Sequence, residues 1–327
     1  MPRVFPPKAW RHFTVCALLA LLTGCAHPFE PRPRQGPTLP APLHLDGWQY
    51  SGRSGVRVSS PHYLIYSTVS DAQLLSRVAQ VMEGAFGQYR QLAPDVPLSA
   101  RPMDCYLFAD RAEWVGFTQA HTGEDAPVYL RINRGGYTVN DWYVAYFLGD
   151  IGTYSVAAHE GFHQYLGRHL KQRIPPFLEE GLACLFEDVT WENRLPRWDL
   201  SINYARQTAL KQAVNDESLL PLDQLISTHA GQVVNRPKEQ IATFYAQCWA
   251  FARFMREAEG GRFRLALEKM LADAASGNLV GAQAPLNDMV FWSPRSAKPV
   301  LEHYFQMDLP GIEREYLQFV AKIVGQQ

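Results

Sequence analysis

Short runs of β-branched and aromatic residues recur in the first half of the chain, and such runs predict strands. Between the first two runs, apolar residues return at every third or fourth position, which is the spacing of an amphipathic helix. This helix is expected to extend from Leu74 to Tyr89, with Ser70 or Asp71 as its cap. The strands are expected at residues 62–70, 103–108, 128–132 and 142–148, with a short helix at 110–120 and a turn at 134–137.

The stretch Ser155–Leu166 is mainly apolar and contains no proline, so it predicts a buried helix extending from about Gly152 to Leu166. The helix should end near Gly167, with His169 in or just past its last turn. This histidine lies six residues after His163, a spacing that turns it about 120° away on a helix, and we expect it on the surface.

After Asp188 the pattern becomes mainly helical, with expected helices at 200–214, 239–258, 262–275 and 312–324 and loops at 189–199 and 276–296. The two patterns together predict an α+β fold, in which a small mixed sheet packs on the central helix and a helical C-terminal lobe follows. The expected boundaries are 47–192 for the first part and 193–327 for the lobe.

The central helix carries the pattern His-Glu-x-x-His, from His159 to His163. Residues four apart on a helix lie on one face, about 40° apart around the axis, so both imidazoles can bind one ion. Catalytic zinc usually takes three protein ligands. A carboxylate at Glu160 could take a proton from water whose pKa the ion has lowered and pass it to a leaving amine, which implies amide hydrolysis.

A third ligand is expected from Pro175-Pro176-Phe177-Leu178-Glu179-Glu180-Gly181. The prolines suit the entry to a second helix, because proline at the first helical position loses no needed N–H. That helix would carry Glu179 and Glu180 in its first turn, and only one of them can point at the ion. Glu180 is the preferred candidate, and Glu179 remains the alternative.

His-Glu-Gly-Phe-His, followed by Pro-Phe-Leu-Glu-Glu-Gly-Leu-Ala with Phe186-Glu187 after it, resembles the gluzincin metallopeptidases of the peptidase MA-like group. The segments 245–251 and 307–316 are similar to later segments of that family, so the resemblance extends from about His62 to the C-terminus. It implies one Zn²⁺ held by His159, His163 and Glu180, a peptide or protein substrate, and a gluzincin-like fold.

One position departs from the family pattern. Many thermolysin-like gluzincins have an aspartate one turn after the ligand glutamate, where it orients a zinc histidine, and here that position is Cys184. Glu187 or Asp188 could serve instead. Such enzymes often use a phenol or imidazole to stabilise the oxyanion opposite the zinc. Tyr245 is our first candidate for that role; the weaker ones are Tyr204, His229 and His303.

The N-terminus has the features of a bacterial lipoprotein signal. Three basic residues precede an apolar run at 13–22 that is too short to span a membrane, and Leu22-Thr23-Gly24-Cys25 resembles a lipobox. Cleavage would remove residues 1–24 and leave a lipid-modified Cys25, the membrane anchor, with Ala26 favouring the periplasmic face of the outer membrane. The alternative is an ordinary signal peptide. Residues 25–46 are rich in proline and predict an extended tether.

Charge and cysteine content limit the remaining possibilities. Removal of residues 1–24 leaves 28 basic and 32 acidic side chains, a net charge of −4 that gives no reason to expect a nucleic-acid partner. Cys105, Cys184 and Cys248 would remain; they permit at most one disulfide, and buried free thiols are expected.

Two alternative functions remain open at this stage. A non-catalytic envelope protein could keep the zinc fold as a scaffold for a peptide or protein partner, which the cysteine at 184 favours and an intact Glu160 disfavours. A zinc hydrolase of peptidoglycan stem peptides would fit the same location.

Overall fold

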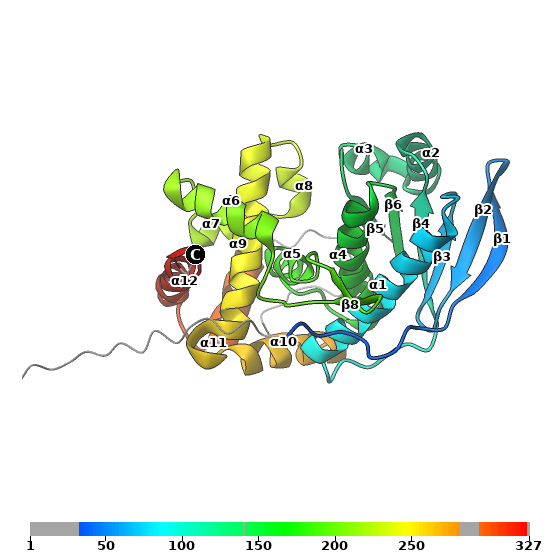
Figure 1. The fold of residues 1–327 in the computed structure, drawn as a ribbon. Coiled ribbons are helices and arrows are strands. Elements are labelled where there is room, and N and C mark those ends of the chain that lie inside the picture. Colours follow the sequence, from blue (N-terminus) through cyan, green and yellow to red (C-terminus); the bar gives the residue numbers. More distant parts are fainter. Residues whose placement is uncertain (1–32, 140, 281–293, 326–327) are drawn as a thin grey trace, which may run out of the picture. The chain divides into compact units, whose positions relative to one another are not determined.

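A six-stranded mixed sheet, in the order β1-β2-β3-β4-β6-β5, forms the first half of the structure (Figure 1). The computed structural model describes residues 33–139, 141–280 and 294–325, without the side chains of 294–296. β4 pairs parallel with both β3 and β6, and the other pairs are antiparallel. The strand order places β1 and β5 at the two edges of the sheet. The strands are β1 (His44–Tyr50), β2 (Arg53–Ser59), β3 (Tyr63–Ser67), β4 (Met103–Phe108), β5 (Gly136–Val139) and β6 (Trp142–Tyr146).

The two faces of this sheet are covered by different helices. Side chains that alternate along β4 and β6 point to opposite faces. Cys105 and Tyr143 belong to the core formed with α1 (Ala72–Leu92) and α4 (Asp150–His169), whereas Phe108 and Val144 join Trp114 of α2 (Arg111–His121) in a second, smaller core. Asp71 caps α1, as the sequence allows, by accepting from the amides of Gln73 and Leu74.

The helix α5 (Pro176–Cys184) contacts both α4 and the longest helix of the second half, α9 (Lys238–Glu257) (Figure 1). It begins at Pro176, as expected for a proline in the first helical turn. Gly181 permits the close approach to α9, because a Cβ atom there would lie 2.1 Å from the carbonyl oxygen of Cys248. The residue before this glycine, Glu180, is therefore held where α5 packs most tightly.

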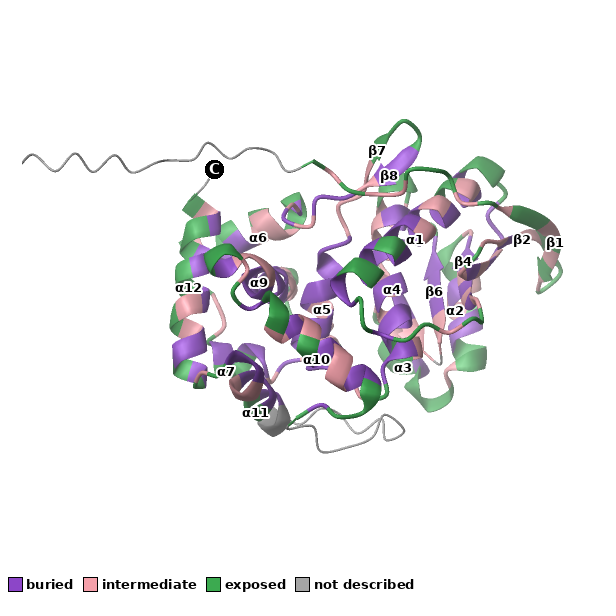
Figure 2. Ribbon diagram, turned by 90° about the horizontal axis from the view of Figure 1, so that it is seen from below, coloured by how far each residue is buried: buried purple, intermediate pink, exposed green. Residues whose placement is uncertain are grey.

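The second half of the described chain is mainly helical, as the sequence predicts from Asp188 onward. In Figure 2, α5 and α9 are coloured mainly as buried, and both contribute residues to the main core. Residues from Arg34 onward belong to one compact unit. The helices that surround α9 are α6 (Tyr204–Asn215), α7 (Leu222–Leu225), α8 (Ala230–Val233), α10 (Arg264–Ser276), α11 (Pro294–Phe305) and α12 (Leu309–Gly325), with a 3₁₀ turn at Ala258–Gly260.

A small hairpin and the N-terminal segment lie against α1. The hairpin is β7 (Thr190–Glu192) with β8 (Leu195–Arg197), in a stretch expected to be a loop. Gln35 forms an isolated bridge with Trp198, just after β8, so the chain is attached to the folded unit from there onward. In the part of the chain that the structure describes, no helix combines the length and apolarity needed to cross a membrane.

Several expectations from the sequence were wrong. Residues 128–132 do not form a strand: a 3₁₀ turn at Gly123–Asp125 leads into α3 (Ala126–Tyr129), which has Pro127 in its first turn. The turn expected at 134–137 instead contains the start of β5. The pattern also missed β1, β2, α7, α8 and α11.

His169 is buried, not on the surface. The central helix ends at His169, two residues beyond the expected end near Gly167. The rotation away from His163 directs the ring toward α1, where it lies near Phe86, and Nδ1 lies 2.7 Å from the carbonyl oxygen of Tyr165.

Candidate metal centre

Three side chains from α4 and α5 converge on one point. The Nε2 atoms of His159 and His163 are 3.2 Å apart, and the Oε2 atom of Glu180 lies 3.3 Å and 3.5 Å from them. The three donors thus form a nearly equilateral triangle. Each side chain is only 12–13% exposed.

The spacing of this triangle fits a zinc ion. Zinc bonds of about 2.0–2.1 Å at tetrahedral angles place donors about 3.4 Å apart. Oε2 of Glu180 is also buried and makes no well-formed hydrogen bond; its nearest partners are the two Nε2 atoms, at ion-pair distance, so a cation at the centre of the triangle would satisfy it. Among the residues that the structure describes, this set is one of two that could hold a metal ion.

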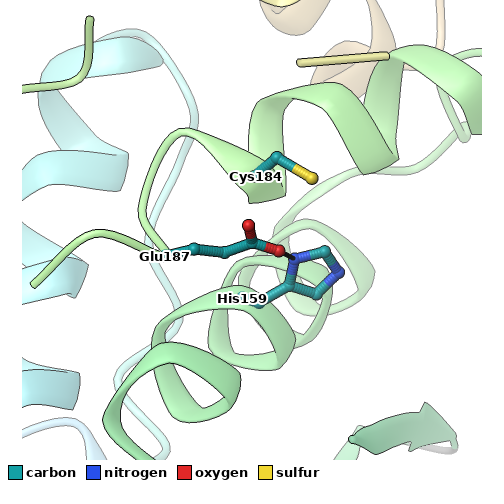
Figure 3. Close-up of side chains that lie close together, drawn as sticks. All are labelled: His159, Cys184 and Glu187. Carbon is teal, nitrogen blue, oxygen red and sulfur yellow. Dashed lines mark hydrogen bonds and ion pairs between the residues drawn. The ribbon is translucent and has the colours of Figure 1, made fainter. Parts of the chain in front are cut away.

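The far nitrogen of His159 is held by a carboxylate. Its Nδ1 atom is 2.9 Å from Oε1 of Glu187 (Figure 3). Arg206 donates to both oxygens of Glu187, at 2.7 Å and 2.9 Å, and the amide of Asn203 donates to Oε2 at 2.7 Å. Such a partner fixes the tautomer of a metal-binding histidine and increases its basicity.

The far nitrogen of His163 has a matching support. Its Nδ1 atom lies 2.9 Å from Oε1 of Glu179, which Arg173 contacts at 2.7 Å. Arg173 also donates to Oε2 at 3.3 Å. Glu179 is therefore not a ligand in this arrangement, because its carboxylate faces the side of the imidazole opposite the triangle.

Cys184 lies beside the first support, and with His159 and Glu187 it forms the other set of clustered donors (Figure 3). This set fits a metal less well. The 2.9 Å separation of Nδ1 and Oε1 is that of a hydrogen bond, and both oxygens of Glu187 already accept from Arg206. The thiol is buried, and its burial raises the pKa of Cys184. Cys105, Cys184 and Cys248 are all buried free thiols, as expected.

Glu160 follows His159 on α4 and is held from the edge of the sheet. Oγ1 of Thr138, on β5, lies 3.0 Å from the backbone oxygen of Glu160 and 3.1 Å from its Oε2. Burial raises the pKa of Glu160, although the nearby imidazoles oppose this. A carboxylate with a raised pKa is a better proton acceptor than an ordinary one.

The protonation of the cluster is linked to its carboxylates. Burial lowers the pKa of His163, but Glu180 and Glu179 outweigh it and raise that pKa to about 9. Burial likewise opposes protonation of His159, but Cys184, Glu180 and Glu187 hold its pKa well above the ordinary value. In the metal-free protein the carboxylates therefore favour protonation of the imidazoles, and a metal ion would compete with those protons.

Of the candidates for oxyanion stabilisation, Tyr245 has the clearest link to the cluster. Its ring centroid is 6.4 Å from that of His159, and the guanidinium of Arg206 lies 4.8 Å from its ring. Burial and the charge of Glu180 raise the pKa of Tyr245 well above its usual range, so its hydroxyl remains a donor.

The other candidates differ in position. His229 caps α8, which contacts α5; burial lowers its pKa, while the charge of Glu180 acts in the opposite direction. Tyr204 is 66% exposed, and His303 packs edge-on against Tyr304 of α11.

The structure thus brings together His159, His163 and Glu180. The roles of Thr138 and Arg206 had no signal in the sequence, because they come from separate elements. Glu187 was one of two residues considered as a support, and Glu179 was considered only as an alternative ligand. Cys25 and the signal sequence at 1–24 lie outside the described residues.

Searches of protein-family models, curated proteins and solved structures find no match to this chain.

Proposed function

We propose that this chain is a zinc-dependent peptidase of the gluzincin type, with one zinc ion held by His159, His163 and Glu180. The observation that carries the proposal is the triangle of donors at 3.2–3.5 Å with a buried carboxylate oxygen at one corner. Glu160 beside this triangle distinguishes a catalytic from a structural site, because a purely structural zinc has no need of that carboxylate.

The chemistry is divided between the ion and the side chains. When bound, zinc would supply Lewis acidity, which polarises a carbonyl and lowers the pKa of water. Glu160 accepts the proton of the attacking water and later donates it to the leaving amine. The hydroxyl of Thr138 keeps the Glu160 carboxylate oriented. Tyr245 donates to the oxygen of the tetrahedral carbon, with Arg206 against its ring.

The edge strand β5 supports a peptide as the substrate. An edge strand has backbone groups that can pair with an added extended chain. β5 is linked to the cluster through Thr138, so a peptide paired with it would lie beside Glu160. A lipid anchor at Cys25 would keep the enzyme at the periplasmic face of the outer membrane.

The first test is zinc content and turnover of native protein and Glu160→Gln. The expected result is one zinc per chain in both, with turnover of casein reduced about 10²–10⁴-fold or more in the variant, since general acid–base catalysis contributes about that factor. His163→Ala and Glu180→Ala should lose zinc. Native-like turnover in Glu160→Gln would refute the mechanism.

Digestion of isolated sacculi beside the casein assay separates the remaining alternatives. A scaffold protein would bind zinc and cleave neither casein nor isolated sacculi. A peptidoglycan hydrolase would release stem peptides from sacculi and leave casein intact.

A further inference from the structure

The segment Arg34–Ala41, which we call the N-terminal strap, is hydrogen-bonded to the folded unit at both ends. Near its start, Gln35 and Trp198 exchange two backbone hydrogen bonds of 2.7 Å. The guanidinium of Arg197 donates to the carbonyl of Pro37 at 2.7 Å. At its end, the backbone of Ala41 makes two hydrogen bonds with the side chain of Gln80 on α1.

The strap contacts residues 186–203, which we call the support loop. Trp198 is almost fully buried, and its indole N–H donates to the carbonyl of Phe186 at 3.0 Å. Arg34 also lies 3.9 Å from Asp188 as an ion pair. The strap therefore contacts the support loop on both sides of the hairpin β7–β8.

The support loop carries two of the groups that hold His159. Glu187, one residue after Phe186, contacts Nδ1 of His159, and Asn203 donates to Glu187 and to the carbonyl of Cys184. Hydrogen bonds from Gln35 to Trp198 and from the indole of Trp198 to the carbonyl of Phe186 thus connect the strap with the residue before Glu187. The carboxylate of Glu187 in turn contacts Nδ1 of His159.

We infer that the N-terminal strap is a positioning element of the metal centre, acting on His159 through the support loop. The inference rests on the proposed zinc site. A site binds its metal more weakly when a ligating histidine is not held in place, because binding then has to fix the orientation of that side chain. The segment that joins the folded unit to the predicted lipid anchor would thereby contribute to metal affinity, in addition to its role as a tether.

Gly36 provides a selective test. A Cβ atom there would lie 2.2 Å from the carbonyl oxygen of Pro196, so Gly36→Ala has to displace the strap from the hairpin. Gly47→Ala in β1 is the matched control, because a Cβ atom there meets nothing within 4 Å. Arg34→Met, which removes only the ion pair with Asp188, is a milder second variant that keeps the test valid if Gly36→Ala does not fold.

The experiment measures zinc affinity of the full chain by chelator competition. Gly36→Ala should bind zinc about tenfold more weakly, since the loss of second-shell support typically costs 10–100-fold. Gly47→Ala should equal the native protein. In a Glu187→Gln background, Gly36→Ala should add little. Unchanged affinity in Gly36→Ala, with faster amide exchange at Trp198 showing that the strap has moved, would overturn the inference.

A metal-free measurement separates this inference from the proposed function. The Nε–H of Arg206 donates to Glu187 at 2.9 Å, and its NMR signal should exchange faster with water in Gly36→Ala than in Gly47→Ala. Unchanged exchange in Gly36→Ala would also overturn the coupling. Absence of zinc from the native protein would instead refute the proposed function, whatever the Arg206 signal shows.

Discussion

The supports of the two histidines have the same chemistry and different origins. In each support a glutamate carboxylate contacts Nδ1 of the histidine and accepts a hydrogen bond from an arginine. Behind His163, Glu179 and Arg173 lie six residues apart, at the start of α5 and just before it. Behind His159, Glu187 and Arg206 come from the support loop and α6 and are separated by 19 residues.

The two supports also differ in their access to water. The side chain of Arg173 is 55% exposed, whereas that of Arg206 is 23% exposed and makes its contact with Glu187 beside the ring of Tyr245. Both carboxylates are buried, with 4% of the Glu179 side chain and 12% of the Glu187 side chain exposed, so the two supports differ in the exposure of their arginines. The same arrangement of groups is thus formed by residues close together in the sequence behind His163. Behind His159 it is formed by residues that only the tertiary structure brings together.

The largest expected effect separates the two carboxylates. Glu187→Ala leaves Arg206 without its carboxylate, and breaking such a pair typically costs about 3–5 kcal/mol. Glu179→Ala leaves Arg173, which can turn to solvent, so we expect a clearly smaller loss. Chemical denaturation of the two metal-free variants and the native protein measures these losses in the free energy of unfolding. Equal losses would contradict the difference between the supports. Zinc affinity should fall about 10–100-fold in each variant.

The next prediction compares the two arginines. Arg206→Met should reduce zinc affinity and turnover together, because Arg206 contacts both Glu187 and the ring of Tyr245. Arg173→Met leaves the buried carboxylate of Glu179 with His163 as its remaining charged partner, so it should also lose stability, but less than Arg206→Met, because solvent reaches the position of the Arg173 guanidinium. Steady-state kinetics at saturating zinc isolates the effect through Tyr245. Tyr245→Phe is the matched control, and normal turnover in that variant would exclude the tyrosine from catalysis.

The pH dependence of zinc binding distinguishes the supports further. Zinc must displace the proton of His163, whose pKa is about 9. Affinity should therefore rise with pH up to about 9, by about tenfold per unit for each proton displaced. In Glu179→Ala the pKa of His163 should be lower, so its contribution should level off at a lower pH. A pH-independent affinity between 6 and 9 would contradict the protonated state of the metal-free rings.

The smallest effect is expected at Cys184. Because Glu187 supplies the carboxylate behind His159, Cys184→Ala should change zinc affinity only a few-fold. A buried thiol replaced by a methyl group loses little packing, so stability should fall by about 1 kcal/mol. A loss of zinc comparable to that of Glu180→Ala would show instead that the thiol is a ligand.

The sequence predicted the parts of the site that depend on helix periodicity. The four-residue spacing of His159 and His163, the proline at the start of α5, and the amphipathic pattern of α1 are local features, and the structure contains each of them. The short strand runs were less reliable. Residues 128–132 have strand-forming composition, and the turn before Pro127 decided their conformation instead.

The amino-acid sequence by itself determined the residue types of the candidate metal site and the helices that present them. Only the tertiary structure decided which carboxylate faces each side of His163, how Thr138 reaches Glu160, and why the strap lies against the support loop. Periodicity is set by neighbouring residues. The hydrogen bond between Arg197 and Pro37 joins residues 160 positions apart, and such contacts depend on the packing of the complete core.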